Sequence, residues 1–392
     1  MSKAQVIGVS MVKFAKPGAN EPYEVMAAKA IQGALDDAGI GYGAIQQAFA
    51  GYVYGDSTCG QRAVYGVGMT GIPVFNLNNY CASGSSALLL ARQAVEAGVV
   101  ECALAFGFEE MRPGALASAW TDRTSPVGWI YDRRLELAPS LPDDAPRAIK
   151  AFGSAGWEYI AQYGANPDIF ARVAVKTRNH AMRNPYALFT KPLTVDEVMQ
   201  APALYPHLTR LMACPPTCGA AAAVVCSAAF AARHGITHAV EIVGQAMTTD
   251  TPASREDLMK LVGSDMTRRA AQQVYDMAGI GPEDVDVVEL HDCFTPNEVI
   301  SYEGLGLCGE GEAERFIHEG DNTYGGKYVI NPSGGLMSKG HPLGATGLAQ
   351  CAELVWHLRG QAGERQVSGA RIALQHNIGL GGACVVTMYR AG

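Results

Sequence analysis

The feature that most constrains the fold of this chain is a short internal repeat whose two copies have matching surroundings. DDAGIG at 36–41 recurs as DMAGIG at 276–281, and each copy ends a helical pattern and leads into an apolar strand. Further along, SGSSALLLARQAVEAG and GATGLAQCAELVWHLRG also echo each other, since each runs from small residues through a helical pattern towards a strand. Two matches in the same context indicate the duplication of one βαβ module.

Apolar strands alternate with helical patterns along most of the chain, which predicts α/β layers with buried sheets. A helical pattern at 23–38 ends at Gly39 and precedes a strand near 46–53. With 392 residues, 48% of them hydrophobic, the chain exceeds the ~250–300 residues at which a single core stops growing. We therefore expect two domains' worth of core.

A stretch at about 112–213 differs from both repeats and is predicted to be inserted between them. It holds 12 Lys and Arg against 9 Asp and Glu, a net +3 within the chain's −8, which leaves −11 elsewhere. Residues 169–195 of it carry five cations and no acid. Such a run is explained equally well by a solvated helix face and by a patch for an anionic ligand such as a nucleotide phosphate.

Charge and cysteine content narrow the class of protein. A net charge of −8 argues against nucleic acid as the main partner, because a polyanion needs a concentrated basic face. No apolar run reaches the ~20 residues that cross a bilayer, and neither a signal-peptide pattern nor a peroxisomal tripeptide is present. Ten cysteines without a C-x-x-C pair favour reduced thiols and no metal site. We expect a cytoplasmic protein.

The segment NNYCASGSS at 78–86 places a cysteine at the start of a helical pattern. Unpaired amides and the helix dipole stabilise a thiolate at such a position, and the small residues around it let a substrate approach the backbone. The alternative is a helix cap with a structural cysteine. Because Ser83 or Ser85 could cap the helix without Cys81, we favour Cys81 as a nucleophile.

Three further segments place reactive groups after a predicted strand or in a loop before a predicted helix. ELHDCF at 289–294 puts His291 and Cys293 at a carboxyl strand end, where α/β sites collect. NPSGG and GHPLG form a glycine-rich loop that could hold His341 against a thiol, although two turns that need glycine explain it too. QHNIGLGG at 375–382 follows a strand and offers backbone amides for an oxyanion hole.

Together, NNYCASGSSA, ELHDCF, NPSGGLMSKGHPLGATG and LQHNIGLGGA resemble the thiolase family, and more narrowly the sterol carrier protein X type of thiolase domain and its bacterial relatives. The resemblance covers nearly the whole chain. It implies an α/β thiolase fold, five-layered αβαβα, from two duplicated halves at 1–111 with 214–237 and at 238–392. It also implies an inserted loop domain at 112–213 that binds coenzyme A, and with the sequence ending at Gly392 we expect no lipid-carrier domain.

The resemblance also implies roles for the motif residues. Cys81 would take up the acyl group and His341 would be the base that activates it. His291 and Cys293 belong to an HDCF loop that replaces the N-E-A-F loop of ordinary thiolases. The cations assigned to coenzyme A are Arg172, Lys176, Arg178 and Arg183.

One departure from the family pattern concerns the second catalytic cysteine. In ordinary thiolases it lies in a C-x-G segment near the C-terminus, and its place is taken here by Asn377. Cys293 is the expected substitute, with His376 as a helper. One oxyanion hole is expected to use His291 with His341, and the other the backbone amides of the nucleophile and Gly379.

The implied function is that of an acetyl-CoA C-acyltransferase (3-ketoacyl-CoA thiolase) of lipid breakdown. It would cleave 3-oxoacyl-CoA with CoA, or run the reverse Claisen condensation, through an acyl-cysteine. Coenzyme A is the co-substrate, no permanent cofactor is expected, and the expected assembly is a homodimer or homotetramer. Two alternatives are a steroid side-chain retro-aldolase with a small OB-fold partner protein and a non-catalytic acyl-CoA- or lipid-binding protein. The retained Cys81 argues against the first, and the Cys81–Cys293 thiol pair against the second.

Overall fold

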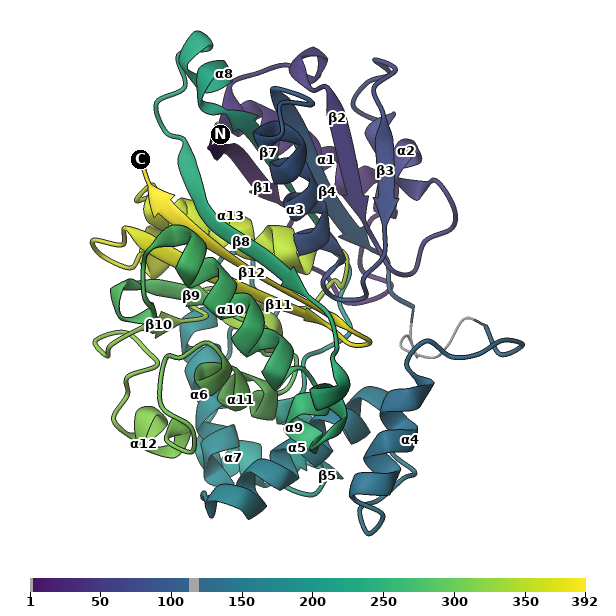
Figure 1. Ribbon diagram of the computed structural model, residues 1–392, viewed down its shortest axis with the longest axis vertical. Helices are drawn as coiled ribbons and strands as arrows, with labels where there is room; N and C mark the ends of the chain where they lie inside the picture. Colours follow the sequence, from purple (N-terminus) through teal and green to yellow (C-terminus); the bar gives the residue numbers. More distant parts are fainter. Residues whose placement is uncertain (1–2, 113–119) are drawn as a thin grey trace.

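The two copies of the sequence repeat belong to two halves of the molecule, which share a ten-stranded sheet (Figure 1). The computed structural model describes residues 3–112 and 120–392. Its sheet order is β10-β9-β11-β12-β8-β1-β7-β4-β2-β3. Counted from the middle outwards, β1, β7, β4, β2 and β3 take the places that β8, β12, β11, β9 and β10 take in the other half. This pseudo-symmetry confirms the predicted duplication and agrees with the two-halved fold that the thiolase resemblance implies.

The strands of the first half are β1 (Ala4–Met11), β2 (Gln47–Gly51), β3 (Val74–Leu77), β4 (Cys102–Glu109) and β7 (Gly219–Ser227). Those of the second half are β8 (Val240–Thr248), β9 (Val287–Glu289), β10 (Val329–Ile330), β11 (Ile372–Gly379) and β12 (Ala383–Ala391). The halves join where β1 pairs with β8, through Gln5 with Glu241 and Val6 with Val240. The two β layers therefore meet along a short hydrogen-bonded seam.

Matching helices accompany the strands. α1 (Tyr23–Ala38) and α10 (Ser264–Ala278) end at Gly39 and Gly279, whose φ angles of 69° and 63° lie in the left-handed region that glycine adopts at low cost. These two residues are the glycines of the sequence repeat, so the repeat marks equivalent helix ends.

The central helices α3 (Ser83–Glu96) and α13 (Thr346–Leu358) pack against each other and against strands of both halves. Almost every residue of α13 is buried. Close approach requires glycine here, because a Cβ atom on Gly84 would lie 2.6 Å from the carbonyl oxygen of Gly344. The N-terminal ends of both central helices therefore meet, which brings the loops that precede them together.

The segment between β4 and β7 includes the predicted loop domain, of which residues 113–119 lie outside the described residues. Its elements are α4 (Gly128–Leu137), α5 (Arg147–Tyr163), α6 (Asp168–Ala181), α7 (Val195–Met199), β5 (Ala203–Tyr205) and β6 (Leu208–Thr209). In Figure 1 these helices lie beside the second half of the molecule, and α5 and α6 contact α11. The remaining helices are α2 (Cys59–Val64), α8 (Ala228–Arg233), α9 (Leu258–Leu261), α11 (Thr295–Gly304) and α12 (Ala313–His318).

Among the described residues, no helix combines the length and the apolar character that a bilayer crossing requires.

Candidate active site

Cys81 lies in the turn between β3 and α3, two residues before the helix begins. The preceding residue, Tyr80, has a φ of 51°, a left-handed conformation that is uncommon for a residue with a side chain. Cys81 is partly exposed, but its surroundings raise the pKa of the thiol to about 12, first through burial and then through the nearby Glu109 carboxylate. The thiolate stabilisation expected from the helix end is therefore outweighed by burial, and the resting thiol is protonated.

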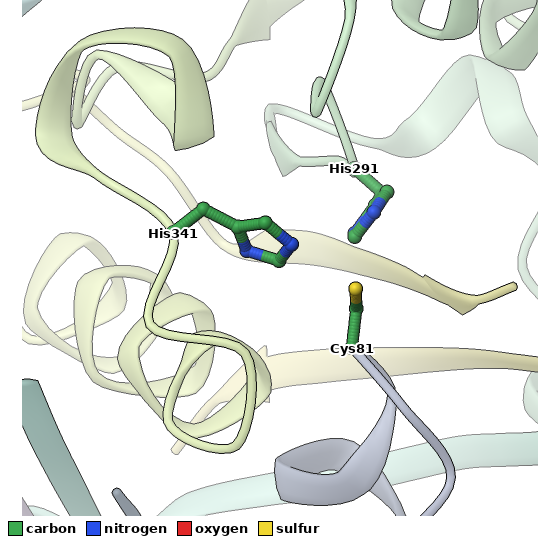
Figure 2. A group of neighbouring side chains, drawn as sticks. All are labelled: Cys81, His291 and His341. Atoms are coloured by element: carbon green, nitrogen blue, oxygen red, sulfur yellow. The ribbon is translucent and has the colours of Figure 1, made fainter. Parts of the chain in front are cut away.

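Two imidazoles converge on this thiol from the second half of the chain. Figure 2 shows Cys81, His291 and His341 pointing towards one another from three separate loops. One ring nitrogen of each histidine and the Cys81 sulfur all lie within 4.8 Å of one another. The two rings meet edge to face, with centroids 5.1 Å apart and an interplanar angle of 82°. The structure thus brings together three of the predicted site residues.

His341 has the hydrogen-bonding pattern of a general base. The Thr346 hydroxyl donates to the carbonyl oxygen of Pro342 at 3.0 Å, so it accepts from Nδ1 of His341, which lies 2.7 Å away. Nε2 of His341 is then the unprotonated nitrogen, and it is buried without a hydrogen-bond partner. Burial lowers the pKa of this imidazole to about 3. A neutral imidazole with a free lone pair is suited to accept the thiol proton.

The HDCF loop is fastened to the loop that carries His341. The buried Asp292 carboxylate accepts hydrogen bonds from the backbone N–H groups of Leu336 and Met337, at 2.7 and 3.3 Å. Both lie in the π-helical turn Gly335–Lys339 just before His341. A Cβ atom at Gly335 would lie 2.2 Å from an Asp292 oxygen, so only glycine fits here. Asp292, which the sequence motif left without a role, holds the two histidine-bearing loops in register.

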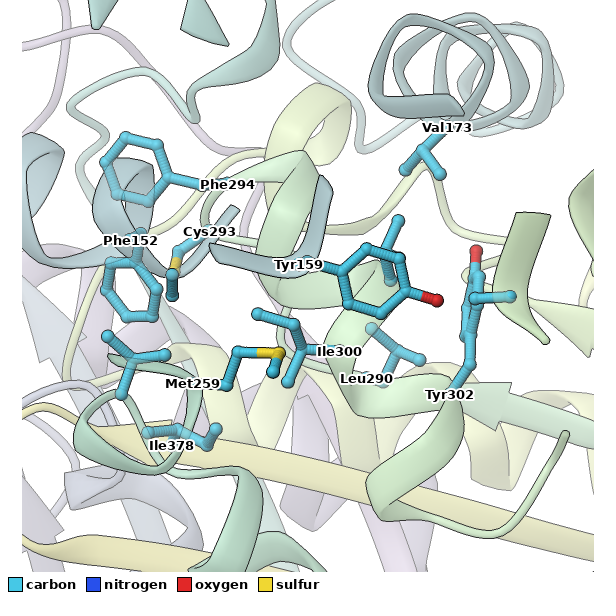
Figure 3. Close-up of a cluster of buried hydrophobic side chains, with 14 of the residues drawn as sticks. Phe152, Tyr159, Val173, Met259, Leu290, Cys293, Phe294, Ile300, Tyr302 and Ile378 are labelled. Carbon is cyan, nitrogen blue, oxygen red and sulfur yellow. The ribbon is translucent and has the colours of Figure 1, made fainter. Parts of the chain in front are cut away.

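Cys293 is buried in an apolar cluster that includes Phe152, Met259, Phe294 and Ile300 (Figure 3). Burial is the largest cause that raises the pKa of its thiol well above the usual range, followed by the neighbouring sulfurs of Cys214 and Cys81. Cys293 is thus a protonated thiol close to the nucleophile, as the predicted proton donor must be.

Two functional neighbours were missed by the sequence reasoning. Cys214 donates its backbone N–H to the carbonyl oxygen of Cys293 at 2.9 Å, and its partly exposed side chain lies near both other thiols. Glu109, at the end of β4, accepts from the backbone N–H groups of Val53, Tyr54 and Gly344. Burial raises the pKa of Glu109 to about 7. Its position at a strand end was the only sequence signal.

The predicted oxyanion glycine lies where the backbones of both halves touch. A Cβ atom at Gly379 would lie 2.0 Å from the carbonyl oxygen of Asn79, so the end of β11 can reach the nucleophile turn only with glycine. Asn377, on the same strand, donates from Nδ2 to Nδ1 of His291 at 3.0 Å. Gly379 therefore lies beside the turn that carries Cys81, and Asn377 lies beside His291.

His376 points to the other face of β11. Its Nε2 lies 3.0 Å from the Thr267 hydroxyl on α10, and its Nδ1 accepts from the backbone N–H of His291 at 3.5 Å. Side chains alternate between the faces of a strand, so His376 cannot share the direction of Asn377. This placement does not support the predicted helper role, and His376 instead supports the backbone of the HDCF loop.

We predict that His376→Gln changes the pH dependence of stability more than it changes turnover. Burial lowers the pKa of His376 to about 3, so below pH 6.5 the unfolded chain binds a proton that the folded chain does not. The wild type should therefore lose stability relative to the variant as pH falls from 6.5 towards 3, by about 1.4 kcal/mol per pH unit. Urea unfolding at several pH values measures this difference, and parallel curves for the two proteins would contradict it.

The four cations assigned to coenzyme A do not form one exposed patch. Lys176 is buried and paired with the buried Glu298 carboxylate, which corrects the prediction for this residue. Arg172 pairs with Asp168 at 2.9 Å. Arg178 packs over the ring of Phe189 and donates to Ser338, while Arg183 lies over Tyr324. The run of cations is explained mainly by contacts within the protein.

A different cation acts on Tyr80, the residue before the nucleophile. The guanidinium of Arg147, in the first turn of α5, is 5.6 Å from the ring centroid of Tyr131. Burial is the largest cause that raises the pKa of Tyr80, and the charge of Arg147 opposes this rise. Arg147 is exposed, and among the described residues it forms no salt bridge. Arg147 is thus a candidate for contact with an anionic substrate. It lies outside the run of cations at 169–195 that the sequence analysis singled out.

A protonated thiol, a free imidazole nitrogen and a second imidazole at one point define a site for nucleophilic cysteine chemistry. Comparison with known proteins gives the family. Residues 5–229 match the N-terminal domain of thiolase, and residues 234–388 match the thiolase C-terminal domain-like family. The chain belongs to the thiolase family and is a thiolase-type acyltransferase.

Similar proteins from several organisms support this assignment to the thiolase family. The chain is 55% identical to sterol carrier protein 2 of Gallus gallus, over 99% of this chain and 71% of that protein. It is 45% identical to the non-specific lipid-transfer protein-like 2 of Caenorhabditis elegans, over 100% and 96% of the two chains. It is 34% identical to an acetyl-CoA acetyltransferase of Methanothermobacter thermautotrophicus, over 99% and 100%.

Solved structures share the fold. Human mitochondrial 3-ketoacyl-CoA thiolase superposes with a TM-score of 0.73 at 16% identity, over 100% of this chain and 99% of the other. The Ltp2-ChsH2(DUF35) aldolase superposes with a TM-score of 0.84 at 22% identity, over 99% and 98%.

Proposed function

We propose that this protein is a 3-ketoacyl-CoA thiolase that works through an acyl-Cys81 intermediate. The observation that carries the proposal is the convergence of the Cys81 thiol with the free Nε2 of His341 and with His291. The family and the acyltransferase class support it, while the 3-oxoacyl-CoA substrate is our inference.

In the first half-reaction, Nε2 of His341 takes the Cys81 proton as the sulfur attacks the 3-oxo carbon. The bond between carbons 2 and 3 then breaks, and its electron pair leaves as the enolate of acetyl-CoA. The Cys293 thiol protonates that enolate, so acetyl-CoA departs and the acyl group stays on Cys81. Negative charge on the attacked oxygen is stabilised by N–H groups of His291 and protonated His341.

In the second half-reaction, the Cys293 thiolate takes the proton of a CoA thiol, which attacks the acyl-Cys81 thioester. The Cys81 sulfur leaves and recovers its proton from His341, so both thiols and both imidazoles return to their resting state. The oxyanion that forms in this step would accept hydrogen bonds from the backbone N–H groups of Cys81 and Gly379. Each oxyanion donor contributes about 2.7–4 kcal/mol in other enzymes.

Coenzyme A would reach the site along the exposed Arg147 and the partly exposed Tyr80, with no permanently bound cofactor. We infer that Arg147 contacts its phosphates in place of the cations named from the sequence.

The test is whether the purified protein alone cleaves acetoacetyl-CoA and longer 3-oxoacyl-CoA thioesters when CoA is added. We expect acetyl-CoA and the shortened acyl-CoA in equal amounts, and a profile over chain length would identify the preferred acyl group. The aldolase of the same fold suggests the rival activity. Carbon–carbon cleavage that needs a partner protein but no free CoA would favour that rival and overturn the proposal.

We further propose a homodimer formed through β3, an edge strand of the sheet. Within the described part of the chain β3 pairs only with β2, and Phe75 on it is 46% exposed, with Tyr65 and Met69 nearby in sequence at 50% and 77%. An open strand edge with apolar side chains is a pairing surface.

Phe75→Asp should weaken this dimer by about 2 kcal/mol or more, as expected for a buried interface side chain. Met277→Asp is the matched control, because Met277 is 54% exposed at the end of α10, away from β3. Light scattering over a dilution series measures the effect, and a dimer unchanged by Phe75→Asp would exclude β3 as the interface.

A further inference from the structure

The three converging side chains have the composition of a zinc site. A cysteine and two histidines offer ligand atoms within 4.8 Å of one another. Among them, Nε2 of His341 is buried and has no hydrogen-bond partner, so its lone pair is free. Thiolate and imidazole are the ligands that Zn²⁺ prefers. A histidine ligates only through an unprotonated nitrogen, however, so the location of the His291 proton decides what the cluster can bind.

The proton of His291 is set by a chain of buried amides and hydroxyls that starts at Gln375. Nε2 of Gln375 lies 2.7 Å from the carbonyl oxygen of Gly347, which can only accept, so the orientation of this side-chain amide is determined. The Tyr389 hydroxyl donates to its Oε1. The second hydrogen on Nε2 is donated to Oγ of Ser85 at 2.9 Å.

Ser85 transmits this orientation to Asn377. Since Oγ of Ser85 accepts from Gln375, its own hydrogen is available, and it is donated to Oδ1 of Asn377 at 2.9 Å. The reversed amide of Asn377 would turn its NH2 group, a donor, towards Ser85 and leave the hydroxyl hydrogen without its acceptor. Nδ2 of Asn377 therefore faces Nδ1 of His291, at 3.0 Å, and donates to it.

The packing around this chain leaves it no room to rearrange. Ser85, Gln375 and Asn377 are each 0% exposed. A Cβ atom on Gly347 would lie 2.1 Å from Oγ of Ser85 and 2.9 Å from Oδ1 of Asn377. The polar groups are thus enclosed by backbone, and in a buried network each hydrogen must find its acceptor.

We propose that Asn377 is a positioning residue that fixes His291 as the tautomer protonated on Nε2. This tautomer has two consequences. The N–H points at the reacting oxygen, a consequence that rests on the proposed function. The same N–H removes one of three ligands, so that a cysteine–histidine–histidine cluster avoids capture by zinc, and this second consequence does not depend on the reaction.

Asn377→Asp tests the proposal with metal binding as the readout. A carboxylate accepts from Nδ1–H, which moves the His291 lone pair to Nε2 and produces the carboxylate–histidine arrangement typical of zinc ligands. We expect the variant to bind one Co²⁺ with a thiolate-to-cobalt absorption band, at least ~10–100-fold more tightly than the wild type. The band should vanish when Cys81→Ala is added. Equal Co²⁺ affinity of wild type and Asn377→Asp would overturn the proposal.

Nitrogen NMR of the histidine rings gives a second, metal-free readout. In the wild type we expect an unprotonated Nδ1 and a protonated Nε2 for His291, and in Ser85→Ala a mixture of both tautomers. Thr267→Ala is the matched control, because it removes a hydroxyl partner from His376, the neighbour of Asn377, and should leave the His291 signals unchanged. Wild-type His291 protonated on Nδ1 would refute the proposal even if the protein cleaves 3-oxoacyl-CoA. The expected signals without any cleavage would refute only the proposed function.

Discussion

Cys81→Ser is expected to lower kcat for 3-oxoacyl-CoA cleavage on the order of 10⁴–10⁶-fold, as removal of a catalytic-triad residue does in other enzymes. The reason is that His341 can take a proton from a thiol, even one whose pKa burial raises to about 12, far more readily than from an alcohol. The oxyanion donors remain in the variant, so substrate affinity should change little. The loss should therefore be seen in kcat and not in KM.

Mass spectrometry of the protein after mixing with acetoacetyl-CoA provides the direct measurement. The wild type should carry an acetyl group on the peptide that contains Cys81, and Cys81→Ser should carry none. Cys308→Ser is the matched control, since Cys308 is also partly exposed with a pKa raised to about 12, but lies after α11 and outside the cluster. An acyl group found on another residue of Cys81→Ser would show that the nucleophile has been misassigned.

The fold could be predicted because the repeat marks positions at which the backbone requires glycine. Gly39 and Gly279 end equivalent helices in the left-handed conformation, a requirement that leaves a trace in any single sequence. The convergence of Cys81, His291 and His341 followed from motifs at strand and helix ends. These positions are local properties of the chain, which the fold then gathers at one place.

What the sequence could not supply was pairing between distant residues. Lys176 lies in a run of cations on α6, yet its partner Glu298 belongs to another helix 122 positions away. Cys214 follows an irregular loop, so no periodicity places it beside Cys293. His376 is a different case, because strand alternation applied to β11 already separates it from Asn377, and this step was open to sequence reasoning.

Cys293→Ala is expected to lower the exchange of the acetyl-CoA α-protons with solvent by about 10²–10⁴-fold, the usual worth of a positioned acid or base. Cys81 should still be acylated by acetoacetyl-CoA, because its base is His341. The effect thus separates the acylation of Cys81 from the proton transfer at the enolate carbon, two steps that a single turnover rate combines. Deuterium exchange into acetyl-CoA, followed by NMR, measures it.

The comparison that decides the role of Cys293 is with Cys214→Ala. Both thiols lie near Cys81, and both have pKa values raised chiefly by burial, so electrostatics does not distinguish them as proton donors. Their positions do distinguish the two thiols. Cys293 lies on the HDCF loop next to Asp292 and His291, whereas Cys214 contributes a backbone N–H that holds the Cys293 carbonyl. We therefore expect Cys214→Ala, which keeps that N–H, to retain most of the exchange. If exchange is lost in Cys214→Ala and kept in Cys293→Ala, the second proton belongs to Cys214, and the cysteine missing from the family's C-x-G segment has been replaced from the first half of the chain.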